Sequence, residues 1–78
     1  MTLNTPLQVA VWTRNEKMVQ LLLEAKANPN DIIEGLGTVL QLAAFEGDEL
    51  IAENLLEANA DVNLRCEGNF RNVRHPLE

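Results

Sequence analysis

The stretch TPLQVAVWTRNEKMVQLLLEAKANPN (residues 5–30) decides the fold, because the chain repeats it as TVLQLAAFEGDELIAENLLEANADVN (residues 38–63). The two stretches align without a gap at a shift of 33 residues, with 11 of 26 positions identical. A fixed period of this length predicts two copies of one structural unit. The identical pairs are Thr5/Thr38, Leu7/Leu40, Gln8/Gln41, Ala10/Ala43, Glu16/Glu49, Leu22/Leu55, Leu23/Leu56, Glu24/Glu57, Ala25/Ala58, Ala27/Ala60 and Asn30/Asn63.

Each copy begins with the signals of a helix start. Thr5 is followed by Pro6, which suits the first helical position, and by Gln8 at the capping-box spacing. Thr38 and Gln41 repeat the same capping box. We therefore predict a short helix over about residues 5–13 and its equivalent after Thr38. The expected buried residues are Leu7, Ala10 and Val11 in the first copy and Leu40, Ala43 and Ala44 in the second.

A second helix follows in each copy. Asn15 and Asp48 are typical helix-capping residues, and both helices are expected to end near Ala25 and Ala58. Asn59 then tolerates a left-handed conformation better than Lys26 does. The apolar stripe predicts a core face of Met18, Val19 and Leu22 in the first copy and of Ile51, Ala52 and Leu55 in the second.

These motifs together resemble the ankyrin repeat: Thr-Pro-Leu, small alanines in the first helix, a Leu-Leu-rich second helix, then Ala-Asn-Pro-Asn or Ala-Asp-Val-Asn. The resemblance covers residues 5–63 and implies an all-α solenoid, in which helix–turn–helix units joined by β-hairpin loops stack on one another. The expected organisation of residues 1–78 is one segment. Repeat 1 spans about 5–37, repeat 2 about 38–70, and 71–78 is either the start of a third repeat or a tail. Residues 37–41 are also similar to ankyrin arrays of large fungal proteins.

The chain departs from the family pattern at several positions. Gln8 and Gln41 stand where the family usually has histidine, so hydrogen bonding to the neighbouring hairpin is expected to suffer. Arg14 and Lys26 replace usual glycines, which costs about 1 kcal/mol each if those turns need a left-handed residue. Asn54 aligns with Leu21, normally a buried leucine, so either the second helix of repeat 2 is rotated or Asn54 is partly exposed.

Composition narrows the cellular context and the class of ligand. The net charge of -6 and pI near 4.6 argue against non-specific nucleic-acid binding, since phosphates would be repelled. No apolar run approaches the roughly 20 residues that span a bilayer, and the first residues, MTLNTPLQVAVW, lack the pattern of a signal peptide. With a single cysteine, we expect an intracellular protein, cytoplasmic or nuclear.

Enzymatic chemistry is not expected. The chain has no serine or tyrosine, and a Cys66–His75 dyad would have no third group to orient it. One histidine and one cysteine do not build a usual metal site. Gly35-Leu36-Gly37 lacks the rest of a phosphate-binding loop and is interpreted as a hairpin turn. The sequence therefore predicts a non-catalytic protein without a cofactor.

The resemblance implies that another protein is the ligand. Ankyrin proteins usually bind partners through hairpin tips and the exposed side of the first helices. Carried onto this chain, the partner-binding residues are Trp12, Thr13, Ile33, Glu34, Leu36, Phe45 and Glu46. Trp12 and Phe45 occupy equivalent positions, and aromatic anchors often dominate an interface. The alternative is that these two rings stack on each other between repeats and support the core.

Other modes of association also follow from the sequence. Residues 31–61 carry eight acids and no base, and a partner with a basic segment would complement them; a solvated outer face is the alternative. The acids are Asp31, Glu34, Glu46, Asp48, Glu49, Glu53, Glu57 and Asp61. Because two repeats are few for a stable stack, we expect marginal stability or self-association through uncapped ends. The segment would otherwise serve as interior repeats of a longer array, or as a regulatory part of a multidomain protein.

Overall fold

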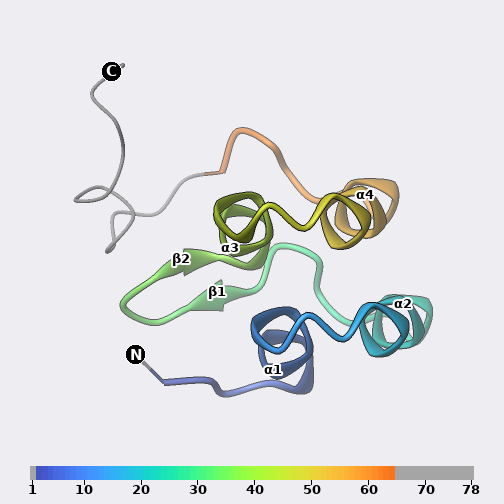
Figure 1. The fold of residues 1–78 in the computed structure, drawn as a ribbon, viewed down its shortest axis with the longest axis horizontal. Helices are drawn as coiled ribbons and strands as arrows, with labels where there is room; N and C mark the ends of the chain where they lie inside the picture. The colour runs from blue at the N-terminus through green and yellow to red at the C-terminus, as the bar shows by residue number, and fades with distance from the viewer. Residues whose placement is uncertain (1, 65–78) are drawn as a thin grey trace.

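Two helix–turn–helix units joined by a β-hairpin make up the fold (Figure 1). The computed structural model describes residues 2–64. The first unit contains helices α1 (Pro6–Trp12) and α2 (Glu16–Glu24), and the second contains α3 (Val39–Glu46) and α4 (Glu49–Glu57). Strands β1 (Ile32–Ile33) and β2 (Gly37–Thr38) pair antiparallel between the two units. The helix–turn–helix prediction is confirmed for both copies.

The units lie side by side in the same orientation. Helix α3 packs beside α1, and α4 packs beside α2, so each helix meets its own repeat equivalent (Figure 1). The hairpin projects from the α1/α3 side, away from α2 and α4. This parallel arrangement is the one expected for neighbouring repeats, while a longer solenoid stays a prediction. The expected third repeat over 71–78 lies outside the described residues.

Side-chain caps begin all four helices as predicted. The Thr5 hydroxyl accepts a hydrogen bond from the Gln8 backbone N–H (3.1 Å), and Thr38 with Gln41 forms a complete capping box. Asn15 and Asp48 cap α2 and α4. The first capping box differs from the expectation, because Gln8 Oε1 accepts from the Asn4 N–H (2.7 Å) and not from Thr5.

A residue in the left-handed conformation follows each of the four helices. Arg14 (φ 60°) and Gly47 (φ 74°) occupy this conformation after α1 and α3, and Lys26 and Asn59 (both φ 73°) occupy it after α2 and α4. Glycine tolerates this region best, so the two basic residues hold strained backbone, at a cost of about 1 kcal/mol each. The strain predicted for these two turns is therefore present in the fold.

The core lies between the helix pairs and under the hairpin. Its apolar residues come from all four helices, the hairpin and the turn that follows α4. They are Leu7, Ala10, Val11, Val19, Ile33, Leu36, Val39, Leu42, Ala43, Ile51, Leu55 and Ala60. The prediction for α1 is confirmed at all three of its residues, and the prediction for α3 is confirmed only at Ala43.

Several predicted core residues of α3 and α2 are not buried. Ala44 is exposed and Leu40 half-buried, whereas Val39 and Leu42 are buried in α3 instead. In α2, Met18 is exposed although its equivalent in α4 is buried. A helix in the middle of a stack buries two sides, one against each neighbouring repeat. Each helix described here has a neighbouring repeat on one side, so the residues on its other side stay exposed or half-buried.

The substitution at Asn54 has a simple structural answer. Asn54 is half-buried in α4, and its equivalent Leu21 is itself largely exposed in α2. Asn54 lines a shallow groove between α2 and α4 together with Leu23 and Glu57. A polar side chain at this position therefore keeps access to water, and no helix rotation is needed to explain it.

Candidate protein-interaction surface

Two exposed aromatic side chains dominate the α1/α3 side of the molecule. Trp12 is the last residue of α1 and is 43% exposed, and Phe45, near the end of α3, is 60% exposed. Because α1 and α3 pack side by side, these equivalent positions are neighbours on one surface. Their exposure means that neither ring is a core residue.

Thr13 extends this surface at the end of α1. It is exposed, and its hydroxyl donates to the Val9 carbonyl (2.8 Å). The hydroxyl oxygen can still accept a hydrogen bond from a partner, because donation uses only its proton. We define the aromatic surface as Trp12, Thr13 and Phe45.

The hairpin presents different residues from those predicted. Ile33 is completely buried and Leu36 nearly so, which makes their assignment to the exposed tip wrong. Glu34 is exposed as expected, and so is Ile32 (50%), which the sequence reasoning missed. Successive strand residues point to opposite faces, so choosing Ile33 in place of Ile32 inverts the face. In the structure Ile33 pairs with Gly37 and Ile32 with Thr38.

A polar network fixes the hairpin against α1. Buried Gln8 donates through Nε2 to Asp31 Oδ1 (3.0 Å) and to the Ile32 carbonyl (3.1 Å). The Thr5 hydroxyl donates to the other carboxylate oxygen of Asp31 (2.6 Å). The expected loss of hairpin bonding at Gln8 is therefore wrong, because glutamine reaches both acceptors. The position of repeat 2 that is equivalent to Asp31 is Leu64, so repeat 2 has no carboxylate at the corresponding place.

The tight turn of the hairpin needs its glycine. The Leu36 N–H donates to the Ile33 carbonyl (3.0 Å), which closes a four-residue turn. Gly35 is the third residue of that turn and has φ 82°, the left-handed value that a type II turn requires there. The interpretation of Gly35-Leu36-Gly37 as a hairpin turn is confirmed.

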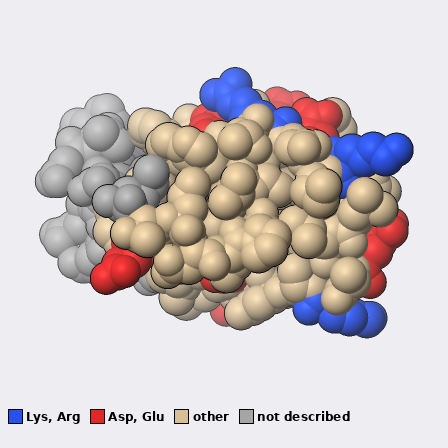
Figure 2. All heavy atoms as spheres, turned by 90° about the horizontal axis from the view of Figure 1, so that it is seen from below, with Lys and Arg blue, Asp and Glu red and all other residues tan. Residues whose placement is uncertain are grey.

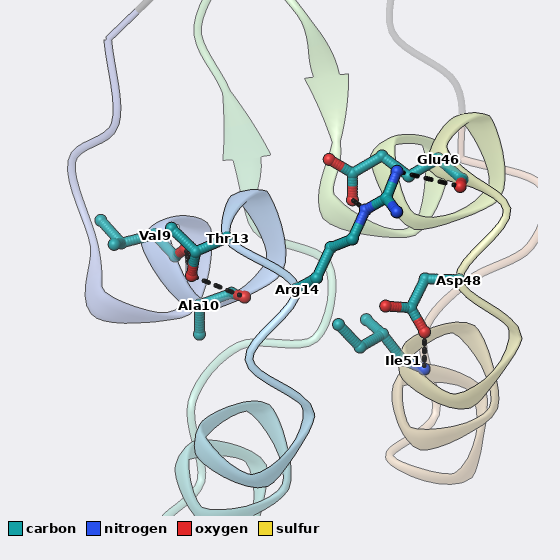
Figure 3. Close-up of polar contacts among 7 residues, drawn as sticks. All are labelled: Val9, Ala10, Thr13, Arg14, Glu46, Asp48 and Ile51. Atoms are coloured by element: carbon teal, nitrogen blue, oxygen red, sulfur yellow. Dashed lines mark hydrogen bonds and ion pairs between the residues drawn. The ribbon is translucent and has the colours of Figure 1, made fainter.

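Glu46 borders the aromatic surface and links the two repeats (Figure 3). Arg14, in the turn after α1, places Nε 3.7 Å from Glu46 Oε1, and its Nη2 donates to the Glu46 carbonyl (3.3 Å). The ion pair is too long to be a hydrogen bond, so the buried Oε1 has no hydrogen-bond donor in the described part of the chain. Burial raises the pKa of Glu46; Arg14 lowers it and Asp48 raises it, both to a smaller extent.

The described residues show no arrangement for metal chemistry. Among residues 2–64, no three His, Cys, Asp or Glu side chains lie close enough to hold a metal ion. The Cys66–His75 pair considered above lies outside the described residues. No helix in the described range is long and apolar enough to cross a membrane.

Comparison with known proteins agrees with the repeat seen in the sequence and in the structure. A family model described as ankyrin repeats (3 copies) matches residues 2–66, well over half of the chain. No curated protein and no solved structure matched the chain. Ankyrin repeats are generally protein–protein interaction modules, and the family is typically non-catalytic. The match, the 33-residue period and the paired helices together show that this chain belongs to the ankyrin repeat family.

Proposed function

We propose that this chain is a non-catalytic protein-binding module whose partner docks on the aromatic surface. The observation that carries this proposal is the exposure of Trp12 and Phe45 at equivalent positions of adjacent helices. The chain contains one tryptophan and two phenylalanines, so two of its three aromatic rings are on this surface. Desolvating large rings on a rigid support is a common source of binding energy.

The polar border supports a directional interface. Glu34 is exposed at the hairpin, whereas the Glu46 side chain is largely buried beside Arg14, so Glu34 is the carboxylate that a partner can reach. A partner segment that combines an apolar anchor with basic residues would match this arrangement. The exposed acids of α4, which include Glu49, Glu53 and Glu57, would add attraction over a longer distance at low salt.

Rigidity of the surface also favours binding. The Gln8–Asp31 network fixes the hairpin to α1, and the Arg14–Glu46 pair ties the turn after α1 to α3. Less ordering entropy is then lost when a partner docks.

A pulldown that compares the chain with two variants tests the proposal. The chain and its double variant Trp12→Ala, Phe45→Ala are immobilised and exposed to the same cell lysate, and recovered proteins are quantified. The matched control is Leu50→Ala, Val62→Ala, which removes two exposed apolar side chains outside the aromatic surface. Partners should be lost from the first variant and kept by the second, with both folded by circular dichroism. Equal recovery by all three proteins would refute the proposal.

A further inference from the structure

The interface between the two repeats shows which side of each helix faces a neighbour. In repeat 1, Val11 and Val19 are completely buried, but their equivalents in repeat 2, Ala44 and Ala52, are not. In repeat 2, Ile51 is completely buried, but Met18 is not. Each repeat therefore has one side for the repeat before it and another for the repeat after it.

Two largely exposed faces of the molecule thus occupy the positions that are equivalent to the two halves of its own internal interface. The first-repeat face consists of Val9, Met18, Leu21 and Leu22. The equivalent residues of repeat 2 are on the side of that repeat that packs against repeat 1. The second-repeat face consists of Ala44, Ala52 and Leu56. The equivalent residues of repeat 1 are on the side of that repeat that packs against repeat 2. Figure 2 looks onto the first repeat, where uncharged atoms fill the middle and charged side chains lie at the rim.

We propose that the first-repeat face of one chain docks on the second-repeat face of a second copy, in the geometry that already joins the two repeats. The occupant is a second copy because the chain itself carries both halves of this interface. Such a contact uses two different surfaces, so it leaves one face open on each end and adds further copies head to tail.

One apolar pair is larger at this junction than inside the molecule, while Val11 and Val19 of the internal interface are replaced there by Ala44 and Ala52. In the internal groove between α2 and α4, Leu23 and Asn54 line the same hollow. At the proposed junction, the positions equivalent to Leu23 and Asn54 are Leu56 of one copy and Leu21 of the next. These two leucines are 42% and 48% exposed in the single chain. The junction therefore joins two leucines where the internal interface joins a leucine and an amide. Burial of both is a favourable contribution that the isolated chain lacks.

Charge complementarity supports the same register. Internally, Glu16 and Leu50 line one hollow beside the turns that follow α1 and α3. At the proposed junction, the equivalent positions are Glu49 of one copy and Lys17 of the next, which would lie beside each other. Both side chains are exposed in the single chain. Inside the molecule Glu16 shares this hollow with the apolar Leu50, whereas at the junction the equivalent positions carry opposite charges.

A backbone contact can also recur. The Asp61 N–H donates to Asn30 Oδ1 (2.7 Å) across the internal interface. The equivalent donor and acceptor at the junction are the Asn28 N–H of one copy and Asn63 Oδ1 of the other. Asn30 and Asn63 hold the same turn, since the N–H of each donates to the side chain two residues earlier (both 2.9 Å).

Sedimentation velocity over a concentration series tests the docking with the 78-residue chain alone. The average mass should rise above 8.7 kDa and continue past the dimer, because the contact does not close. Leu21→Glu and Leu56→Glu should each weaken association at least tenfold, while Leu50→Glu, an exposed site on neither face, should leave it unchanged. A mass that stays at the monomer value at all concentrations would overturn the proposal.

Mixing the two blocked variants separates head-to-tail docking from other modes. Leu21→Glu retains an intact second-repeat face, and Leu56→Glu retains an intact first-repeat face. Each should be monomeric alone, and an equimolar mixture should form a 1:1 dimer that grows no further. A symmetric dimer of either variant alone, or a mixture that stays monomeric, would contradict the proposal.

Charge exchange provides a test that does not touch apolar packing. Lys17→Glu should weaken self-association severalfold at low salt, and mixing it with Glu49→Lys chains should restore a mixed complex. Both sites are exposed, so folding is expected to be unaffected. Unchanged association of Lys17→Glu in low salt would show that the register is wrong.

Discussion

Met18 and Ile51 occupy the same position in the two repeats, yet Met18 is 42% exposed and Ile51 is completely buried. The difference arises because Ile51 lies on the side of α4 that meets α2, whereas the same side of α2 has no described helix against it. Position within the stack, and not the local sequence, therefore decides which apolar residues belong to the core.

This relationship predicts unequal costs for the same kind of truncation. Ile51→Ala should lower the free energy of unfolding by about 2–5 kcal/mol, because it leaves a cavity between the repeats. Met18→Ala should cost less than about 1 kcal/mol, since most of the side chain already contacts water. Urea denaturation of dilute monomeric samples gives both values. Similar losses for the two variants would contradict the assignment of the internal interface.

Gln8 should be more important for stability than its repeat equivalent. Gln8→Ala removes the donor to Asp31 and the Ile32 carbonyl and the acceptor of the Asn4 N–H. Leaving these groups unpaired should cost about 1–3 kcal/mol.

Gln41→Ala is the matched control for Gln8. Within residues 2–64, Gln41 Oε1 accepts the capping bond from the Thr38 N–H (2.7 Å), so the loss should be nearer 1 kcal/mol. Thermal unfolding followed by circular dichroism measures both variants. A larger loss at Gln41 than at Gln8 would argue against the network.

Relief of left-handed strain should stabilise the protein. Lys26→Gly places the permissive residue at φ 73° and should raise the free energy of unfolding by up to about 1 kcal/mol. Asn59→Gly is the matched control at the same φ, and its gain should be smaller because asparagine tolerates this region. Chemical denaturation distinguishes the two, and a destabilised Lys26→Gly variant would show that the lysine side chain has another role.

The raised pKa of Glu46 predicts a pH-dependent effect of neutralising it. A carboxyl whose pKa is raised by folding stabilises the protein below its unfolded pKa, and this contribution is lost as pH rises through the folded pKa. Glu46→Gln should therefore be more stable than the wild type at pH 7, and the difference should vanish near pH 4.

Arg14 supplies the control for the Glu46 prediction. Because Arg14 lowers the pKa of Glu46, removing it by Arg14→Ala should enlarge the gain from Glu46→Gln at pH 7. Urea midpoints of the four proteins of this cycle, taken between pH 4 and 7, provide the measurement. A Glu46→Gln variant that is less stable than wild type at pH 7 would mean that the ion pair outweighs desolvation.

Local signals explain how much of the fold was predictable. The 33-residue period can be read by comparing the chain with itself, and the caps at Thr5, Thr38 and Asp48 and the left-handed residues depend on a few neighbouring residues. Burial of Ala44 and Met18 was mispredicted because it depends on which repeat lies beside each helix. The helix pattern alone gives the same answer for both copies.

The candidate site was only partly predictable for a related reason. Trp12 and Phe45 were identified from their shared phase, whereas Ile33 was chosen where Ile32 is exposed, because a two-residue strand gives too little alternation to fix its face. The Gln8–Asp31 bond joins residues 23 apart in sequence, so no local motif announces it.

The most direct test of the proposed function follows Trp12, the single tryptophan of the chain, while a partner binds. Chain labelled with 5-fluorotryptophan has one such fluorine, and its NMR resonance is recorded during titration with a partner recovered by the pulldown. The expected result is a shift or broadening that saturates with binding, together with at least tenfold weaker affinity of the Trp12→Ala, Phe45→Ala variant. An unchanged resonance at a concentration where calorimetry shows the partner fully bound would contradict docking on the aromatic surface.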